Sequence, residues 1–253
     1  MKRHVLHILI LLISLGVHAK GPVKDRESGY MVRAGYTVGA VTPMPIPQEI
    51  IVINSFSPKG GISLGVEGYR NITDRVGLST GLSIFYKGFN TSANVKNYKM
   101  SITMEGSTMS GYFTGCDVTD IALKGLSVPL LVLVNATPDF RIGFGPYAEM
   151  YMNPAFKGEV YDSPNGKGYL RVDTPIGEKV IIDRSNPASY DFSEYMRSFS
   201  AGISLSLDYS IMDHATIFAK ADWSLTPALD PGFEAIAFRM YPVFATFGIA
   251  YKY

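Results

Sequence analysis

Apolar and polar side chains alternate with a period of two residues along much of this chain. The clearest segment is 199–209, where every second residue is apolar and the residues between are Ser, Gly or Asp. Its apolar face consists of Phe199, Ala201, Ile203, Leu205, Leu207 and Tyr209. A β-strand places alternating residues on two opposite faces, whereas a helix would spread them over all sides. The alternation therefore predicts a strand with one apolar and one polar face.

Seven further segments show the same alternation or a closely related apolar run. They cover residues 30–40, 62–67, 76–87, 126–134, 142–150, 216–225 and 243–252. The segment 126–134 is the most uniformly apolar of them and contains Pro129. Together with 199–209, these segments predict eight strands.

Short and long connections alternate between the predicted strands. The short ones are 71–74, 135–139 and 210–214, and the long ones are 41–58, 91–122, 154–195 and 228–238. In an up-and-down barrel this order places all short turns on one rim and all long loops on the other. Outer-membrane barrels have short periplasmic turns and long extracellular loops. The pattern therefore predicts an all-β fold, an eight-stranded antiparallel up-and-down transmembrane β-barrel with long extracellular loops.

The long connections hold roughly 100 residues, a large share for simple links. Two of them contain strand-like runs separated by turn residues. These runs are 98–104 and 112–113 in one connection, and 159–161, 169–172 and 179–182 in the other. Asn165-Gly166 and Pro175-Ile176-Gly177 between the latter runs are turn signals. We therefore expect the barrel wall to extend beyond the membrane, and closure of these hairpins into the wall would give ten strands.

Composition favours lipid on the apolar side of the strands. Hydrophobic residues make up 47% of the chain and charged residues 18%, below the roughly 25% of an ordinary soluble domain. No segment after residue 19 approaches the length of apolar sequence that a transmembrane helix needs. A closed barrel instead pairs every backbone polar group within lipid. We therefore expect apolar side chains outside and polar ones inside; a soluble periplasmic barrel with an apolar ligand inside would reverse the faces.

The first 19 residues have the pattern of a secretory signal peptide. Lys2 and Arg3 precede an apolar run over 5–15, and Val17-His18-Ala19 offers small residues at a cleavage position. The alternative is a membrane anchor helix, which needs about 20 apolar residues. We expect cleavage after Ala19, so that residues 20–253 form one barrel domain in the outer membrane.

Charge and the inventory of His and Cys restrict the chemistry. The net charge is +1, which argues against nucleic-acid binding through a basic surface. Only His214 lies after residue 19, and the single Cys116 cannot form an internal disulfide. A zinc site needs several such ligands, and a Ser-His-Asp triad would have to use His214. We therefore expect no enzymatic activity, no catalytic residue, no metal site and no cofactor.

Charged residues on the polar strand faces are expected to point into the barrel. They are Arg33, Glu67, Lys87, Glu149, Asp208, Lys220 and Asp222. The interior of an eight-stranded barrel is only wide enough for side chains, and an unpaired buried charge is costly. We expect a polar network of ion pairs that plugs the barrel. The alternative is the lining of a narrow polar conduit.

Aromatic residues gather near both ends of the predicted strands. Those near the short-turn rim are Tyr30, Tyr209, Tyr251 and Tyr253, and those near the long-loop rim are Tyr36, Tyr86, Tyr151, Trp223 and Tyr241. We expect them to form two aromatic girdles at the membrane interfaces. The alternative is that strands are simply rich in aromatic residues.

Apolar residues also gather in the connection 91–122. They are Met100, Met104, Met109, Tyr112 and Phe113. They could form an exposed adhesive patch or pack the loop onto itself, and we favour packing.

Four stretches carry a family likeness. They are Gly125-Leu126-Ser127-Val128-Pro129-Leu130-Leu131, Gly143-Phe144-Gly145-Pro146-Tyr147, the Gly-rich hairpin 60–87 and the aromatic-ended strand 247–253. Together they resemble the PorT-like outer-membrane β-barrel family of Bacteroidetes-type, Gram-negative bacteria. The resemblance implies the barrel fold and an outer-membrane location, and it implies no common ligand and no catalytic residue. The last strand also resembles the signal that the outer-membrane assembly machinery reads.

These patterns predict an integral outer-membrane β-barrel protein with a structural or surface-recognition role through its long extracellular loops. The alternative is a small passive or gated outer-membrane channel. A lipid-modifying barrel enzyme is disfavoured, because His214 falls on the short-turn side. The expected partners are outer-membrane lipid and, during biogenesis, the assembly machinery, with no nucleic acid. We expect a monomer.

Overall fold

The computed structural model describes residues 28–233, 235–236 and 238–253. The predicted signal peptide, residues 1–19, lies outside the described residues. Strands make up almost all regular structure in the described part of the chain, together with one short 3-10 helix. Within the same residues, no helix is long and apolar enough to cross a membrane.

The elements follow one another along the chain as a series of strands of unequal length. They are β1 (Gly29–Pro43), β2 (Ile50–Pro58), β3 (Gly61–Asn71), β4 (Val76–Met104), β5 (Ser107–Asn135), β6 (Phe140–Tyr151), β7 (Ala155–Tyr161), β8 (Tyr169–Val172), β9 (Lys179–Ile181), β10 (Ala188–Asp191), the helix η1 (Ser193–Tyr195), β11 (Phe199–Ser210), β12 (Ala215–Ser224) and β13 (Met240–Lys252).

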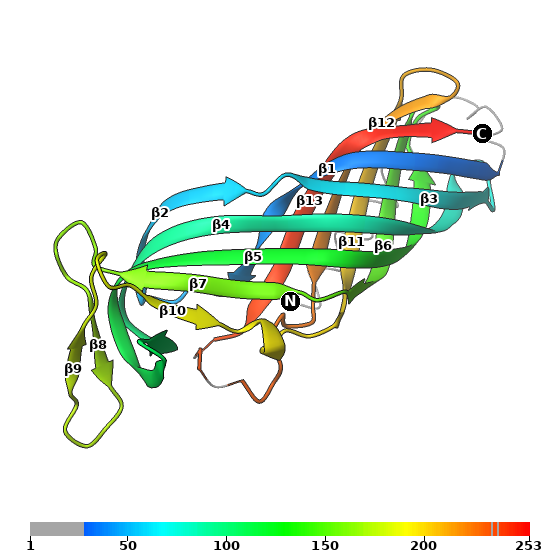
Figure 1. The fold of residues 1–253 in the computed structure, drawn as a ribbon. Helices are drawn as coiled ribbons and strands as arrows, with labels where there is room; N and C mark the ends of the chain where they lie inside the picture. Colours follow the sequence, from blue (N-terminus) through cyan, green and yellow to red (C-terminus); the bar gives the residue numbers. More distant parts are fainter. Residues whose placement is uncertain (1–27, 234, 237) are drawn as a thin grey trace.

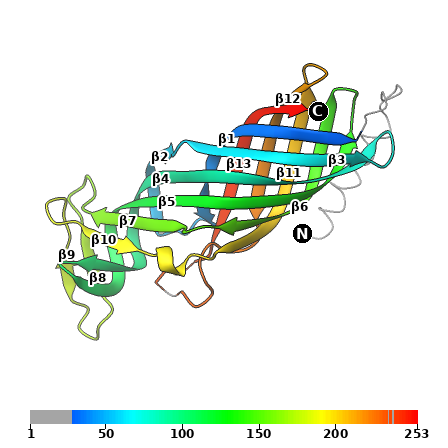
Figure 2. The same ribbon diagram turned by 45° about the vertical axis from the view of Figure 1, so that its right-hand side comes forward.

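Eight of these strands pair antiparallel in a closed ring (Figure 1, Figure 2). Their order around the ring is β1, β3, β4, β5, β6, β11, β12 and β13, and β13 pairs back to β1. They correspond to the eight segments that the alternation predicts, so the up-and-down barrel is confirmed. Strands β10 and β7 also connect β4 to β5, since β10 pairs with β4 and β7 pairs with β5. Counted through these two strands, the ring has ten strands, which is the alternative that the sequence allowed.

The short connections lie together on one rim, as predicted. They join β3 to β4, β5 to β6 and β11 to β12, and backbone hydrogen bonds close them, such as Ile72 N–H to the Val76 carbonyl at 2.9 Å. The end of β13 reaches the same rim as the start of β1 (Figure 1). There the Tyr253 N–H donates to the Tyr30 carbonyl over 3.0 Å.

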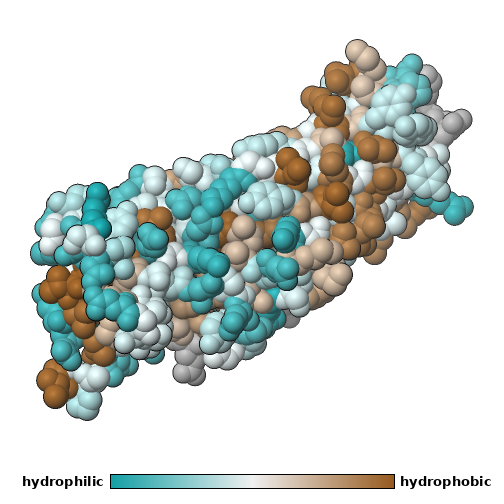
Figure 3. Space-filling view, in the orientation of Figure 1, coloured by the Kyte–Doolittle hydropathy of each residue, from teal (hydrophilic) through white to brown (hydrophobic). Residues whose placement is uncertain are grey.

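Between the short-turn rim and the level of Tyr36 and Tyr86, the ring strands form what we call the membrane barrel. Most of its apolar side chains face outward, as Leu205 does on β11, whereas Ser206 and Asp208 of the same strand are buried inside. A few apolar side chains are also buried in the interior, namely Met31, Leu131, Leu133 and Phe218. Figure 3 shows hydrophobic side chains gathered over this end of the molecule. The predicted apolar-out arrangement is therefore confirmed, and a barrel with an apolar interior at this level is excluded.

The polarity of the two faces reverses along β4, although alternate residues keep the same inward parity as far as Val95, after which the register shifts before Tyr98. In the membrane barrel, Leu82 is exposed outside while Ser79 and Lys87 are buried inside. Further along the strand, the inward residues become apolar, and Phe89 and Val95 are each 3% exposed. The reversal marks where lipid outside the wall gives way to water.

This reversal corrects the long connection predicted over 91–122. Residues of that stretch belong to β4 and β5, which continue as one hairpin of two 29-residue strands. The period-two alternation does not stop at the membrane surface, but the apolar residues move from the outer face to the inner face. They do so because the inner face now packs against protein and the outer face meets water. The predicted hairpin of 98–104 with 112–113 is the far end of this pair.

Above the membrane barrel lies what we call the extracellular extension, formed by residues 88–123 of β4 and β5 with β2, β7, β8, β9 and β10. In it, β2 pairs with β4, β7 and β8 pair with β5, β10 pairs with β7, and β9 pairs with β8. Its inner faces share one hydrophobic core that includes Phe113, Ile121, Phe156 and Leu170. The prediction that the wall extends beyond the membrane is confirmed.

The strand-like runs around Asn165-Gly166 pair differently from the expected hairpin. Strands β7 and β8 each pair with β5, one after the other, and the chain between them is a loop in which Gly166 has a φ of 69°. The hairpin instead forms between β8 and β9, through the turn that contains Gly177 with a φ of 63°. Both turn signals therefore lie in turns or loops, as predicted. Strands β7 and β8 do not pair with each other, because each pairs with the long strand β5 instead.

Candidate functional site

The structure places the seven charged residues expected inside the membrane barrel on its inner face. Six of them are buried, and Lys220 is half-buried. They come from six ring strands and form three separate groups, each containing both signs of charge.

The first group is centred on Arg33 of β1. Its Nε lies 3.0 Å from Glu67 Oε2 on β3, and its Nη2 lies 2.5 Å from Asp208 Oδ2 on β11. The Ser206 hydroxyl donates to Asp208 Oδ1 over 2.9 Å, and the guanidinium lies 4.8 Å from the centroid of the Phe218 ring. One cation therefore joins strands from opposite arcs of the ring.

The second group joins Lys87 of β4 to Glu149 of β6. Lys87 Nζ lies 2.7 Å from Oε1 and 2.8 Å from Oε2 of Glu149. The Tyr151 hydroxyl donates to Glu149 Oε2 over 2.9 Å. The ammonium also lies 4.5 and 4.6 Å from the ring centroids of Phe85 and Phe244. Both charges are thus paired and shielded at the top of the polar interior.

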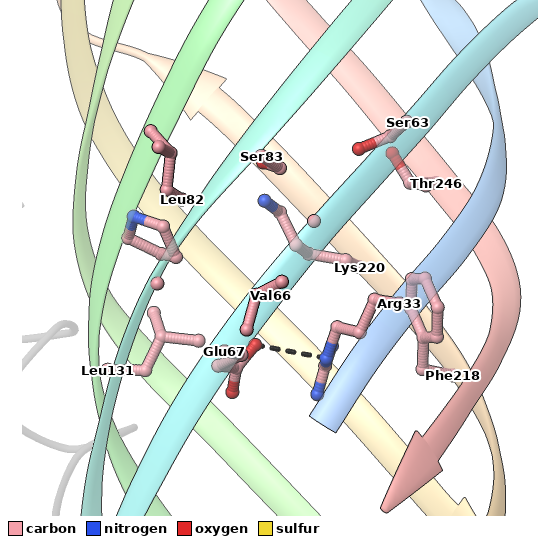
Figure 4. Close-up of a pocket in the computed structure, with 13 residues that line it drawn as sticks. Arg33, Ser63, Val66, Glu67, Leu82, Ser83, Leu131, Phe218, Lys220 and Thr246 are labelled. Carbon is pink, nitrogen blue, oxygen red and sulfur yellow. Dashed lines mark ion pairs between the residues drawn. The ribbon is translucent and has the colours of Figure 1, made fainter. Parts of the chain in front are cut away.

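The third group lies on β12 and β11. Lys220 Nζ lies 3.2 Å from Asp222 Oδ2, and the Ser204 hydroxyl donates to Asp222 Oδ1 over 2.6 Å. Figure 4 shows Lys220 near Arg33 and Glu67 of the first group, with Ser63, Ser83 and Thr246 around the same space. Hydroxyl groups therefore fill the gaps between the ion pairs.

Arg141 is an interior cation that the strand boundaries drawn from sequence missed. It is 2% exposed, its Nε donates to Asn135 Oδ1 over 3.2 Å, and its guanidinium lies 4.6 Å from the Tyr69 ring centroid. Arg141 has the same parity as Glu149 on β6, so extending the predicted strand by one residue would have identified it. With Arg141, four cations and four carboxylates face the interior.

The spaces left among these groups are small. One cavity of about 40 Å³ lies between Arg33, Glu67 and Lys220 (Figure 4), and another of about 10 Å³ lies beside Lys87 and Glu149. A water molecule needs roughly 10–15 Å³ of such volume. These cavities have room for water molecules and are too small for an organic solute.

Most of the aromatic residues assigned to girdles lie on the outer surface. Those exposed or half-exposed there are Tyr30, Tyr36, Tyr86, Tyr209, Trp223, Tyr241, Tyr251 and Tyr253. Register places Tyr36 and Tyr86 at one level, since each pairs with Ile62. The assignment of Tyr151 to the girdle is wrong. It is 5% exposed, because it shares the inward parity of Glu149 and hydrogen-bonds to it.

The apolar residues singled out in the stretch 91–122, which the sequence predicted as a long connection, pack mostly inside the extracellular extension. Met100 and Phe113 are fully buried, and Met104 and Met109 pack against the same core. Tyr112 is exposed. The packing interpretation is therefore confirmed, and these residues form no continuous adhesive patch.

A second polar feature lies within the extracellular extension and was missed by sequence reasoning. Asp117 of β5 is buried and accepts a hydrogen bond of 2.8 Å from the Tyr190 hydroxyl of β10. Burial raises the pKa of Asp117 to about 6, although hydrogen bonds from Tyr190 and Thr119 oppose this rise. Asp117 lines a cavity of about 200 Å³ together with mostly apolar side chains. Its parity on β5, opposite to that of the outward Val118, was the available signal.

The remaining candidates for chemistry stand apart. Cys116 is buried, with Sγ 3.2 Å from the Ser92 hydroxyl, and His214 lies exposed in a short turn with Nδ1 3.0 Å from the Lys252 carbonyl. In the part of the chain that the structure describes, no three His, Cys, Asp or Glu side chains are grouped as metal ligands.

Residues 19–230 match the family described as outer membrane protein beta-barrel domain. No curated protein matches the chain significantly. Among solved structures, Ail of Yersinia pestis in complex with the heparin analogue sucrose octasulfate is 8% identical, with a TM-score of 0.39, over 90% of this chain and 100% of Ail.

Two further solved structures show a comparable likeness. OprG of Pseudomonas aeruginosa is 12% identical, with a TM-score of 0.36, over 92% of this chain and 99% of OprG. CarO2 of Acinetobacter baumannii is 11% identical, with a TM-score of 0.39, over 90% of this chain and 100% of CarO2.

Proposed function

We propose that this chain, which belongs to the outer membrane protein β-barrel domain family, uses its membrane barrel as a closed anchor that displays the extracellular extension for recognition. The chain is an integral β-barrel protein of the outer membrane.

The single observation that carries this proposal is the filled interior of the membrane barrel. Each of the four buried carboxylates there is paired with a cation, and the bridges of Arg33 and Lys87 cross between strands, whereas that of Lys220 stays within β12. An open pore would expose these charges to water and replace the ion pairs by hydration. The close pairing, with hydroxyl groups between the pairs, supports a structural plug.

The core of the extracellular extension supports the same reading. Beyond Lys87 on β4 the inner face becomes apolar, starting at Phe89, which shares one buried core with Phe85 and Phe244. An ion following the barrel axis would pass from the polar interior into this apolar core, which is unfavourable. The extension instead offers a folded, water-facing outer surface, and exposed segments on a rigid scaffold commonly carry recognition.

Finer assignments extend this proposal. We place the chain in the PorT-like type of Bacteroidetes-type bacteria, on the strength of the runs 125–131 and 143–147, which lie on the paired strands β5 and β6. Removal of residues 1–19 as a signal peptide would leave one barrel domain. The proposed partners are outer-membrane lipid and the assembly machinery, which would recognise the aromatic-ended strand β13. We propose a monomer without enzymatic activity.

Conductance in planar bilayers tests the plug. The refolded protein, shown to be folded by heat-modifiable gel mobility, is expected to give no steady channel current, while a porin added to the same bilayers conducts. Steady current from the unmodified protein would overturn the plug in favour of the channel. Trypsin treatment of intact cells tests the display. Cleavage at Arg171 or Lys179 on the β8–β9 hairpin is expected, with the membrane barrel protected.

A further inference from the structure

Just above the membrane barrel, the wall has a gap between the end of β1 and strand β2 of the extracellular extension. Strand β1 pairs with β3 only as far as Thr37, which faces Gly61. Beyond this point, residues 38–43 of β1 pair with β13 on one side, and β2 pairs with β4 alone. Two strand edges therefore face each other without hydrogen bonding just above the membrane barrel.

A cavity of about 200 Å³ lies at this gap. Its walls come from the end of β1, from β2, β4 and β5, and from the segment before β13. The lining is mainly apolar and includes Val41, Ile50, Phe89 and Val95. A buried apolar cavity of roughly 150 Å³ binds benzene. This cavity is therefore large enough for a single aromatic ring with a short substituent.

The carboxyl group of Asp117 makes the cavity chemically unusual for this protein. The described residues contain five buried acidic side chains: Glu67, Asp117, Glu149, Asp208 and Asp222. Each of the four in the membrane barrel forms an ion pair with Lys or Arg. Asp117 takes part in none of the ion pairs found among the described residues, and its carboxyl group instead interacts with the hydroxyl groups of Tyr190 and Thr119. A buried carboxylate without a cation favours a cationic ligand.

Aromatic rings border the same space. Phe56 and Phe89 stack with ring centroids 5.7 Å apart, and Tyr98 meets Phe238 edge-on at 5.5 Å. All four residues line the cavity. Ring faces attract organic cations, with a larger effect where water is excluded. Carboxyl and aromatic groups thus converge on one small apolar space.

From the unpaired carboxyl group of Asp117 and the aromatic walls around it, we propose that this cavity binds a small organic ammonium ion with an apolar body, such as an arylalkylamine. The ammonium group pairs with the Asp117 carboxylate, and the apolar body fills the space between β1 and β4. This site goes beyond the plugged anchor, and it stands whether or not the barrel conducts.

The groups around Asp117 define how the site responds to pH. The titratable residues that line the cavity with it or contact it are Tyr98 from β4 and Tyr190 from β10, and burial raises the pKa of both phenols well above the usual range. Glu49, just before β2, acts electrostatically on Tyr98. Neither phenol titrates between pH 5 and pH 8, so protonation of Asp117 is expected to govern binding in this interval.

Calorimetric titration of the full chain in lipid nanodiscs tests the proposal, with 2-phenylethylamine as the probe and 2-phenylethanol as its neutral match. We expect the amine to bind at pH 7.5, roughly tenfold or more tighter than the alcohol. Asp117→Asn is expected to remove that preference, and the amine is expected to bind more weakly at pH 5.

The control variant is Asp191→Asn, which removes an exposed carboxylate from the same extension and should leave binding unchanged. Heat-modifiable mobility checks that both variants fold. Equal binding of amine and alcohol, or an Asp117→Asn protein that still prefers the amine, would overturn the cation site. Absence of binding by both probes would overturn the cavity as a ligand site. Neither result bears on the conductance test of the plug.

Discussion

The Lys87 ammonium group lies within 2.8 Å of both carboxylate oxygens of Glu149, across the interior from β4 to β6. Both side chains are at most 3% exposed. The pair lies where the polar interior of the membrane barrel ends and the apolar core of the extracellular extension begins, since Phe85 and Phe244 of that core flank the ammonium. Breaking it leaves one buried charge without its counter-ion.

Removal of one partner is therefore expected to be strongly destabilising. Lys87→Met or Glu149→Gln should lower the free energy of unfolding by about 3–5 kcal/mol, the usual cost of orphaning one buried charge. Denaturant unfolding in lipid vesicles, followed by gel mobility, measures this. The double variant Lys87→Met with Glu149→Leu should recover much of the loss.

The exposed pair Lys157 and Asp191 provides the control, because its side chains are 61% and 52% exposed. Lys157→Ala should change stability by about 0–1 kcal/mol. If Lys87→Met proved no more harmful than Lys157→Ala, the pair would not act as a structural plug.

The Asp117 carboxyl group should make the extracellular extension less stable as pH rises. Its pKa is raised from 3.8 to about 6 in the folded chain, so the folded state binds the proton more readily than the unfolded state does. Stability is then greatest below pH 4, falls between about pH 4 and pH 6, and is constant above, with a total loss of about 3 kcal/mol.

Hydrogen exchange of β5 and β10 at pH 4.5 and pH 7.5, corrected for intrinsic rates, measures this dependence. Asp117→Asn should abolish it, because an amide does not titrate and can still accept the Tyr190 hydrogen bond. A pH dependence of equal size in the Asn variant would assign the effect to another group.

Leu82 faces lipid on β4, whereas Asn90 faces outward above the reversal of polarity. Leu82→Arg should therefore destabilise the barrel by roughly 2–4 kcal/mol, the cost of a cation near the bilayer centre. Asn90→Arg should change stability by less than about 0.5 kcal/mol, as is usual for surface substitutions. Similar losses for the two variants, measured by unfolding in vesicles, would place the membrane boundary elsewhere.

Trp223 is the single tryptophan of the chain, and it lies exposed on the outer surface of β12. Its fluorescence should be quenched by lipids that carry bromine on their acyl chains, more strongly when bromine lies near the headgroups than near the chain ends. Trp223→Phe should remove the signal. Unquenched emission in brominated vesicles would contradict the lipid-facing position.

Much of the membrane barrel could be read from single residues in the sequence. The alternation at 199–209 identified β11 and both of its faces, and the short turn 210–214 identified its return to β12. Parity alone would also have assigned Tyr151 and Arg141 to the interior, because each lies an even number of residues from Glu149. Arg141 was missed because the predicted strand began one residue too late, and Tyr151 was misassigned because it was grouped with the aromatic residues of the rim.

The sequence by itself determined the eight strands of the membrane barrel, the positions of the short turns, and which residues share a face, because these depend on local period and length. Only the tertiary structure decided where the polarity of those faces reverses. Phe89 and Lys87 both point inward because they share the same parity on β4, and parity does not tell whether the outer face at each level meets lipid or water. Pairings across the ring also needed three dimensions: Arg33 meets Asp208 from a distant strand, whereas Asp117 forms no ion pair with any residue that the structure describes. The local pattern of residues does not reveal which side chains meet across the barrel, because the closure of the ring sets the distances between strands that are far apart in the sequence.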